Sequence, residues 1–143
     1  MTVPLDPAAA RSVVRVRVRF GETDLMGVVH HSSYLAFMEV ARIEWLRRRG
    51  ITYAAMAEHG VHLPVVELSL KYKAPARFDE EIDVEITLVE VGAVSVRFDY
   101  RIVRAVDGTV CTEGMTRLAC VDSRGLHRIS EEMAAVIRRA EGR

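Results

Sequence analysis

The sequence has little of what marks several classes of protein. Only two of its 143 residues are cysteine, and no run approaches the roughly 20 apolar residues of a membrane-spanning helix. Cys111 and Cys120 lack the CxxC spacing of a zinc site and are too few for a disulfide framework, so we expect two buried free thiols. The first residues, MTVPLDPAAARS, do not combine a basic start with a long apolar run, as a secretory signal does. We therefore expect a soluble, cytoplasmic protein.

Net charge is also absent. The 20 lysines and arginines balance the 20 aspartates and glutamates, and Lys71 and Lys73 are the only lysines. A neutral chain has no overall field that attracts nucleic acid or an anionic membrane, and we expect neither as a partner. The length fits one domain with one core. We take residues 1–143 as a single domain, with residues 1–11 as a flexible N-terminus.

Residues 13–20, VVRVRVRF, alternate between apolar and mostly basic side chains, which is typical of a half-buried strand. The side chains predicted to face inward are Val14, Val16, Val18 and Phe20. The arginines between them suggest a nucleic-acid surface, but no aromatic residues for base stacking are interleaved with them. A solvated outer face of a sheet is therefore the favoured interpretation.

The next segment predicts a long helix over residues 33–49, closed by Gly50 and ending in three arginines that complement the helix dipole. At 100° per residue, one apolar stripe gathers Tyr34, Phe37, Met38, Ala41 and Trp45. Further apolar residues lie on the other sides. We therefore expect this helix to be covered on most sides.

The chain then changes to β-structure. After a short helix ended by Gly60, a strand is predicted with Pro64 at its start or at a bulge. The inward side chains of that strand are predicted to be Val66, Leu68, Leu70 and Tyr72. Three further long strands follow up to residue 122, as an antiparallel meander.

Two glycines and the C-terminal segment complete this outline. Asp107 and Gly108 signal a tight turn between two strands, and Gly114 is interpreted as a bulge because it breaks the alternation. Residues 130–139 predict a surface helix. A five-stranded antiparallel sheet wrapped around one long central helix, with leftover apolar surface buried by a second copy, satisfies this order of elements. This α+β architecture is the hotdog fold.

The stretch FGETDLMGVVHHSSYLAFMEVARIEWLRRRGI, residues 20–51, resembles the N-terminal motif of the hotdog thioesterases of the 4-hydroxybenzoyl-CoA thioesterase-like family, which includes the Tol-Pal-associated acyl-CoA thioesterases. The positions that fit the motif are Phe20, Asp24, Gly27, Val28, Val29, His31, Tyr34, Phe37, Glu39, Ala41, Arg42 and Gly50. The likeness continues more weakly through LKYKAPARFDEEIDV. One departure is Glu22, which stands where many members carry aspartate.

This resemblance implies hydrolysis of an acyl thioester, usually acyl-CoA, to the free acid and CoA. The enzyme would be a homodimer or homotetramer with sites at the subunit interface, and no cofactor is expected. The carboxylate of Asp24 would attack the thioester carbonyl or activate water. A backbone N–H at the start of the helix, carried over to His31, would hold the carbonyl oxygen.

The residue types agree with these roles independently. Free N–H groups at a helix N-terminus carry partial positive charge and suit an oxygen that becomes negative during the reaction. Gly27 lets the backbone approach a substrate and take positive φ. The carboxylate of Asp24 can form a mixed anhydride or remove a proton from water, and both routes stay open. The alternative is that Asp24 only ends a turn.

Other polar residues near the motif allow two interpretations each. A metal at His30 and His31 is disfavoured because adjacent histidines point in different directions and no third ligand is evident; His30 is expected to be exposed. Glu39 is either an auxiliary acid or base or the structural partner of Arg42, and the pair is favoured. Tyr34 lines either an acyl pocket or the core.

The basic residues Lys71, Lys73 and Arg77 are candidates for binding the phosphates of CoA, and ordinary surface charge explains them equally well. Two other functions remain open beside the acyl-CoA thioesterase. One is a thioesterase acting on acyl carrier protein. The other is a hotdog module that binds acyl groups or assembles without catalysis. The acyl group itself is not specified by the sequence.

Overall fold

The computed structural model describes residues 5–139, so residues 1–4 of the expected N-terminal segment lie outside it. The elements are, in chain order, β1 (Arg11–Arg17), the 3₁₀ turn η1 (Phe20–Glu22), α1 (Ser33–Arg48), α2 (Tyr53–Glu58), β2 (Val65–Tyr72), β3 (Glu81–Val91), β4 (Ser95–Arg104), β5 (Val110–Ala119), β6 (Val121–Asp122), β7 (Gly125–Leu126) and α3 (Glu131–Ile137). The β6–β7 hairpin was not foreseen from the sequence.

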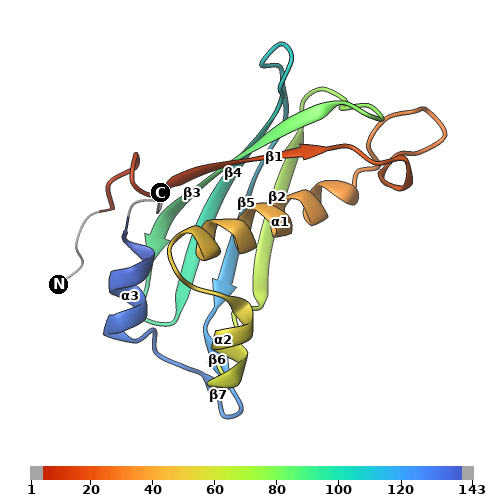
Figure 1. The fold of residues 1–143 in the computed structure, drawn as a ribbon. Helices are drawn as coiled ribbons and strands as arrows, with labels where there is room; N and C mark the ends of the chain where they lie inside the picture. The colour runs from red at the N-terminus through yellow and green to blue at the C-terminus, as the bar shows by residue number, and fades with distance from the viewer. Residues whose placement is uncertain (1–4, 140–143) are drawn as a thin grey trace.

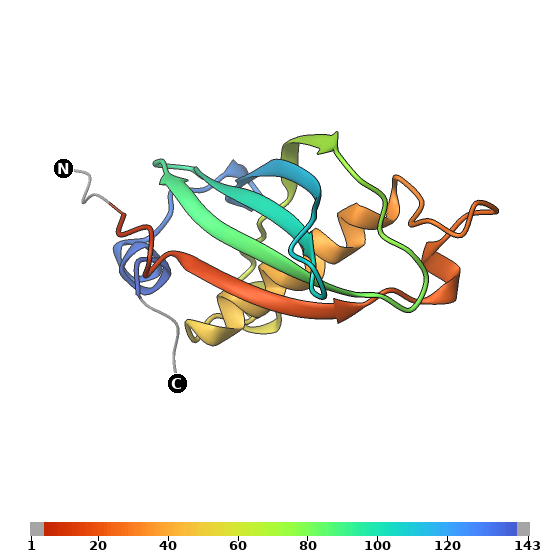
Figure 2. The ribbon, with the colours of Figure 1, turned by 90° about the horizontal axis from the view of Figure 1, so that it is seen from above.

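The five long strands form one antiparallel sheet in the order β1-β3-β4-β5-β2. The sheet curves around α1, which crosses its concave face (Figures 1 and 2). This arrangement confirms the predicted hotdog fold. The residues that link β1 to α1 lie at one end of the helix, whereas α2 and α3 lie toward the other end (Figure 1).

The predicted apolar stripe of α1 is confirmed, because all five of its side chains are buried. Trp45 is fully buried and meets the ring of Phe98 edge to face, with 5.0 Å between the ring centroids. The indole N–H of Trp45 donates to the backbone oxygen of Ala10 at 2.9 Å. An aromatic residue that is buried and also finds a partner for its polar atom stabilises a core strongly. Trp45 therefore joins α1 to both β4 and the start of β1.

The C-terminal end of α1 is fixed by Arg49. Its guanidinium stacks over the ring of Trp45. It donates to Ser12 Oγ at 2.9 Å and to the backbone oxygen of Ala9 at 2.7 Å. Gly50 follows with φ of 86°, the left-handed conformation that ends many helices. Arg49 thus does more than complement the dipole: it attaches the end of the helix to the residues that open β1.

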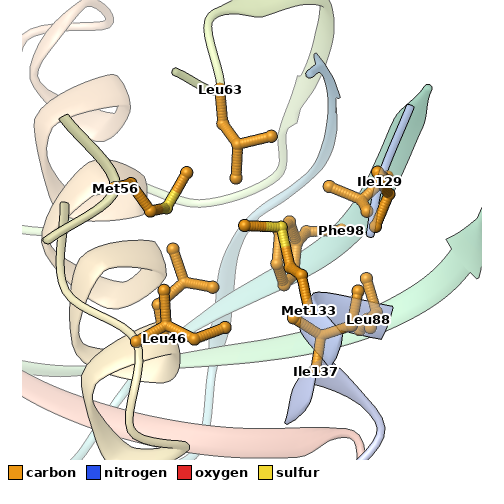
Figure 3. A pocket seen from close by; sticks show the side chains of 10 residues that line it. Leu46, Met56, Leu63, Leu88, Phe98, Ile129, Met133 and Ile137 are labelled. Atoms are coloured by element: carbon orange, nitrogen blue, oxygen red, sulfur yellow. The ribbon is translucent and has the colours of Figure 1, made fainter. Parts of the chain in front are cut away.

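A second apolar cluster lies where α2 and α3 meet the end of α1 (Figure 3). Its side chains include Leu46, Met56, Phe98, Met133 and Ile137. The remaining space among them is about 10 Å³, too small for an organic ligand and barely enough for one water molecule. The predicted C-terminal helix therefore covers an extension of the core, and Ile137 is buried in it.

The convex face of the sheet carries the charges, as the arginine pattern predicts. Arg15 binds Asp83 through two hydrogen bonds of 2.8 and 3.0 Å, and Arg17 pairs with Glu81 at 3.0 Å. Hydrogen bonding to Arg15 lowers the pKa of Asp83 below its usual value. Such exposed pairs contribute little to stability, about 1 kcal/mol or less each. They do keep this face polar.

Three details of the sequence interpretation are corrected by the structure. Phe20 is exposed because β1 ends at Arg17, and its ring packs edge-on against Phe78 with centroids 5.7 Å apart. Leu68 and Tyr72 of β2 do share the concave face with buried threonines opposite them, but they are 46% and 52% exposed. The reason is that β2 is an edge strand, with a neighbouring strand on one side only within residues 5–139.

The third correction concerns Gly114, which is not at a bulge. It pairs in register with Leu70 on one side and Tyr100 on the other. A Cβ atom at this position would lie 2.6 Å from the backbone oxygen of Ser69 and 2.7 Å from a methyl group of Leu70. Glycine is therefore required by the close approach of β2 to β5.

We expect Gly114→Ala to lower the free energy of unfolding by about 1–3 kcal/mol, because the added methyl group must displace the β2 backbone. Gly92→Ala is the matched control, since its Cβ would meet its nearest atom at an ordinary 3.4 Å. Chemical denaturation of both variants measures the difference. Equal stabilities would show that β2 moves away from β5 at no cost.

Candidate active site

The residues around Asp24 form a small hairpin. Thr23 and Val29 pair as an isolated antiparallel bridge, and the Asp24 N–H donates to the Val28 oxygen at 2.9 Å. The Gly27 N–H donates back to the Asp24 oxygen at 3.0 Å, and Gly27 has φ of 74°. A three-residue hairpin loop favours a left-handed residue at its third position, which explains the glycine.

The side chain of Asp24 takes part in this turn. Its Oδ1 accepts a hydrogen bond of 2.8 Å from the Met26 N–H, and the residue is exposed. Aspartate commonly bonds the backbone two residues on at the start of a turn. The bond fixes the orientation of the carboxylate, so the turn interpretation and a chemical role are compatible.

The hairpin is attached to the rest of the fold by backbone hydrogen bonds on both sides. The Val29 N–H donates to the Ala76 oxygen at 2.8 Å, and the His30 N–H donates to the Glu22 oxygen at the same distance. The carboxylate of Glu22, which is buried, accepts from the Arg19 N–H at 2.6 Å. Glu22 therefore stabilises the segment that leads into the hairpin, and this role accounts for an acidic side chain at this position.

The start of α1 presents backbone donors. The Ser33 N–H donates to the His30 oxygen at 2.9 Å, which fixes the planar peptide unit between His30 and His31. The His31 N–H points away from that oxygen, and within residues 5–139 it has no hydrogen-bond partner. Ser32, the N-cap residue, makes no side-chain cap to the helix. Its hydroxyl instead bonds Nδ1 of His30, which is half-buried rather than exposed as predicted.

The hairpin, the helix start and the end of β2 border an open hollow of about 380 Å³. The motif contributes Asp24, Val29, His31 and Tyr34, and the segment after β2 contributes Lys73, Ala74 and Pro75, together with Tyr72 of β2 itself. Tyr34 is buried, its hydroxyl accepts from the Ala76 N–H at 3.4 Å, and burial raises its pKa. The residues that line the hollow thus include one aspartate, one histidine, two tyrosines and one lysine.

The structure brings together some of the predicted site residues and separates others. Asp24, His31, Tyr34 and Lys73 line the same hollow, and Gly27 lies in the adjoining turn without lining it. Lys71 lines a different hollow, on the convex face. It precedes Tyr72 in β2, and neighbouring residues of a strand point to opposite faces. Arg77 is exposed; its backbone forms a bridge with Val28, and its N–H donates to Glu80 Oε1 at 2.5 Å.

The predicted pair of Glu39 with Arg42 is wrong. Arg42 is buried and donates to the Tyr100 hydroxyl at 3.3 Å, which in turn bonds Thr116 Oγ1 at 2.6 Å. Glu39 is exposed and does not line the hollow.

Tyr72 is a polar lining residue that the sequence did not place at the site. Its hydroxyl donates to the backbone oxygen of His31 at 2.9 Å, and its ring lies 5.6 Å from that of Tyr34. The only available signal was its place beside Lys73 on the inward side of a strand. The contact joins residues 41 positions apart, which local spacing does not reveal.

Comparison with known proteins decides the family. The model of the thioesterase-like superfamily matches residues 18–137. The chain belongs to this superfamily. The acyl-CoA thioester hydrolase YbgC of Escherichia coli is 36% identical over 107 residues, covering 75% of this chain and 79% of that relative. The family resemblance and the thioesterase class are thereby confirmed.

Solved structures agree with this membership. A hypothetical protein of Thermus thermophilus, TT1821, is 42% identical with a TM-score of 0.84 and covers 89% of this chain and 95% of its own. A DHNA-CoA thioesterase of Staphylococcus aureus is 29% identical with a TM-score of 0.77, covering 83% and 79%. No helix within residues 5–139 is long and apolar enough to cross a membrane.

Gly27→Val tests the geometry of the hairpin. A Cβ at this position would meet no atom of the chain within 4 Å, so the positive φ is the constraint rather than space. We expect a loss of about 1–2 kcal/mol in the free energy of unfolding, because a branched residue is strained in the left-handed region. Gly21→Ala, where φ is not positive and space is also open, should be neutral. Equal unfolding free energies for the two variants would contradict this account.

Proposed function

We propose that this protein hydrolyses acyl-CoA thioesters to the free acid and CoA. The observation that carries the proposal is that Asp24 and His31 line one hollow, and that within residues 5–139 the His31 N–H has no hydrogen-bond partner. A carboxylate beside a polarised peptide donor is the pair that thioester hydrolysis needs, one to supply or activate the nucleophile and one to stabilise the developing oxyanion. The name of the E. coli relative supports the same reaction.

The geometry supports a division of roles within the hollow. The thioester carbonyl oxygen lies against the His31 N–H, whose direction is set by the bond from Ser33 to the His30 oxygen. Asp24, with Oδ1 held by the Met26 N–H, uses its other oxygen to attack the carbonyl carbon or to deprotonate water. Donors of this kind contribute a factor of about 10² to 10³ in rate.

The CoA portion is assigned to the side of the hollow formed by Lys73. Its ammonium is half-exposed and lies 3.8 Å from Glu113, a loose pair that leaves donors for a phosphate or the pantetheine amides. Both cysteines are free thiols, which fits the reducing cytoplasm where CoA esters are used. Lys71, Arg77 and Glu39 have no part in this assignment.

The active form is a homodimer built on β2 and α1. Beside the exposed side chains of β2, the outer side of α1 exposes Leu35 and Val40 by 38% and 48%. β2 also presents an unpaired strand edge, since it ends the sheet. An apolar helix face next to an open strand edge suits a second copy related by twofold symmetry. The second subunit would cover the side chains of β2 that face the concave side and are exposed in one subunit, such as Leu68 and Tyr72.

Asp24→Asn tests the reaction. Asparagine preserves the turn because its side-chain oxygen still accepts from the Met26 N–H, but it removes the charge. We expect kcat to fall by about 10²- to 10⁴-fold with folding unchanged. The measurement is release of free CoA thiol from short, long and aromatic acyl-CoAs.

The matched control is Asp79→Asn, another exposed loop aspartate, which has φ of 67° and pairs with Arg17 outside the hollow. It should keep wild-type turnover. Activity of the Asp24→Asn protein equal to wild type would remove Asp24 from the mechanism. Wild-type turnover only with a thioester of acyl carrier protein would move the substrate from CoA to that carrier.

Leu68→Asp tests the homodimer. A charge placed on the concave face of β2 would be buried by the second copy, and we expect association to weaken by about 100-fold or more. Ser69→Asp is the control, because Ser69 is exposed on the convex face of the same strand. Sedimentation velocity distinguishes the species. A monomeric wild type, or a dimeric Leu68→Asp variant of unchanged affinity, would contradict the proposed interface.

A further inference from the structure

We infer that Tyr72 is a positioning residue for the oxyanion donor: its hydroxyl holds the His31 backbone in the orientation that directs the His31 N–H into the hollow. This inference rests on the proposed function. Tyr72 contacts His31 through the backbone oxygen, at 2.9 Å, and not through the imidazole. Its effect is therefore on the course of the main chain at the helix start.

The two peptide units that flank the His31 Cα are each fixed by one bond to a carbonyl oxygen. The Ser33 N–H holds the unit between His30 and His31, through the His30 oxygen at 2.9 Å. The Tyr72 hydroxyl holds the unit between His31 and Ser32 through the His31 oxygen, and the Ser32 N–H of the same unit also donates to His30 Nδ1 at 3.2 Å. Because each unit is planar, fixing both restricts φ and ψ of His31 together. The His31 N–H lies in the first unit, so these two torsions set its direction relative to the second unit, which Tyr72 holds.

The two hydrogen bonds to these carbonyl oxygens come from different parts of the fold. The bond from Ser33 is local and belongs to the first turn of the helix region, which frays readily on its own. The bond from Tyr72 comes from the sheet and joins positions 41 residues apart. The His31 carbonyl is thereby held at a fixed position relative to β2 and to the Lys73 side of the hollow. An oxyanion donor is effective only where its position is set before the reaction.

Packing alone does not account for this tyrosine. Its ring is about half exposed, so phenylalanine would bury as much apolar surface. The hydroxyl is the part that makes a specific contact at the site. Tyr34, which lies beside it, directs its own hydroxyl to the Ala76 N–H and not to His31. The assignment therefore applies to Tyr72 and not to aromatic residues of the hollow in general.

The test is Tyr72→Phe, which removes only the hydroxyl. We expect kcat to fall by about tenfold, since a small displacement of a reacting group is costly, while KM stays within about twofold. The control is Tyr100→Phe, the same chemical change at a buried tyrosine of the sheet that bonds Thr116 and Arg42 and not His31. It should lose stability without losing kcat.

A second readout does not depend on turnover. The chain has five histidines, so labelling histidine with ¹⁵N gives few backbone amide signals, and His31→Gln identifies that of residue 31. Tyr72→Phe should shift the His31 amide signal, and Tyr100→Phe should leave it in place. An unshifted signal would overturn the contact between Tyr72 and the donor.

The kinetic outcomes separate this inference from the proposed function. Turnover by wild type with an undiminished kcat in Tyr72→Phe would overturn the role of Tyr72 and leave the thioesterase intact. A rise in KM with unchanged kcat would also overturn it, because that pattern indicates a role in substrate binding. Absence of wild-type turnover on every thioester tested would overturn the proposed function, and the role of Tyr72 with it.

Discussion

The edge-to-face contact of Trp45 with Phe98, together with the hydrogen bond from the Trp45 indole to Ala10, holds α1 in the concave face of the sheet. The start of the helix is placed by the same packing, because a helix is rigid over its length. His31 therefore lies at a fixed position beside the end of β2, where the Tyr72 hydroxyl donates to its backbone oxygen. The chemistry that we propose at the start of α1 thus depends on core packing near the end of the helix.

The fold could be predicted from local patterns because each pattern had one physical solution. The stripe from Tyr34 to Trp45 can be buried only along one side of a helix, and alternation in β3 and β4 can be satisfied only by a sheet with one buried face. The same patterns predicted which way the β2 side chains point. They did not predict the exposure of Leu68, because periodicity specifies a face and does not say what covers it.

The candidate site was predicted in the part that is contiguous in sequence. Asp24, Gly27 and His31 lie within one hairpin and helix start, so the motif and the turn chemistry are both local. Tyr72 enters from a strand far along the chain, and the side-chain direction of Arg42 is decided by Tyr100 across the sheet. Contacts of this kind depend on the tertiary arrangement. Gly114 was misread for the same reason: a close approach of two strands leaves no trace in the alternation of either strand alone.

The strand order has a consequence for the synthesis of the chain. Among the described strands, β2 pairs only with β5 and β1 only with β3, so neither strand finds its neighbour at the time it leaves the ribosome. The apolar stripe of α1 likewise precedes the whole meander that covers it. Non-local pairing of this kind slows folding and leaves apolar surface exposed meanwhile. The nascent chain up to β2 is therefore the stage at which a chaperone would have most to protect.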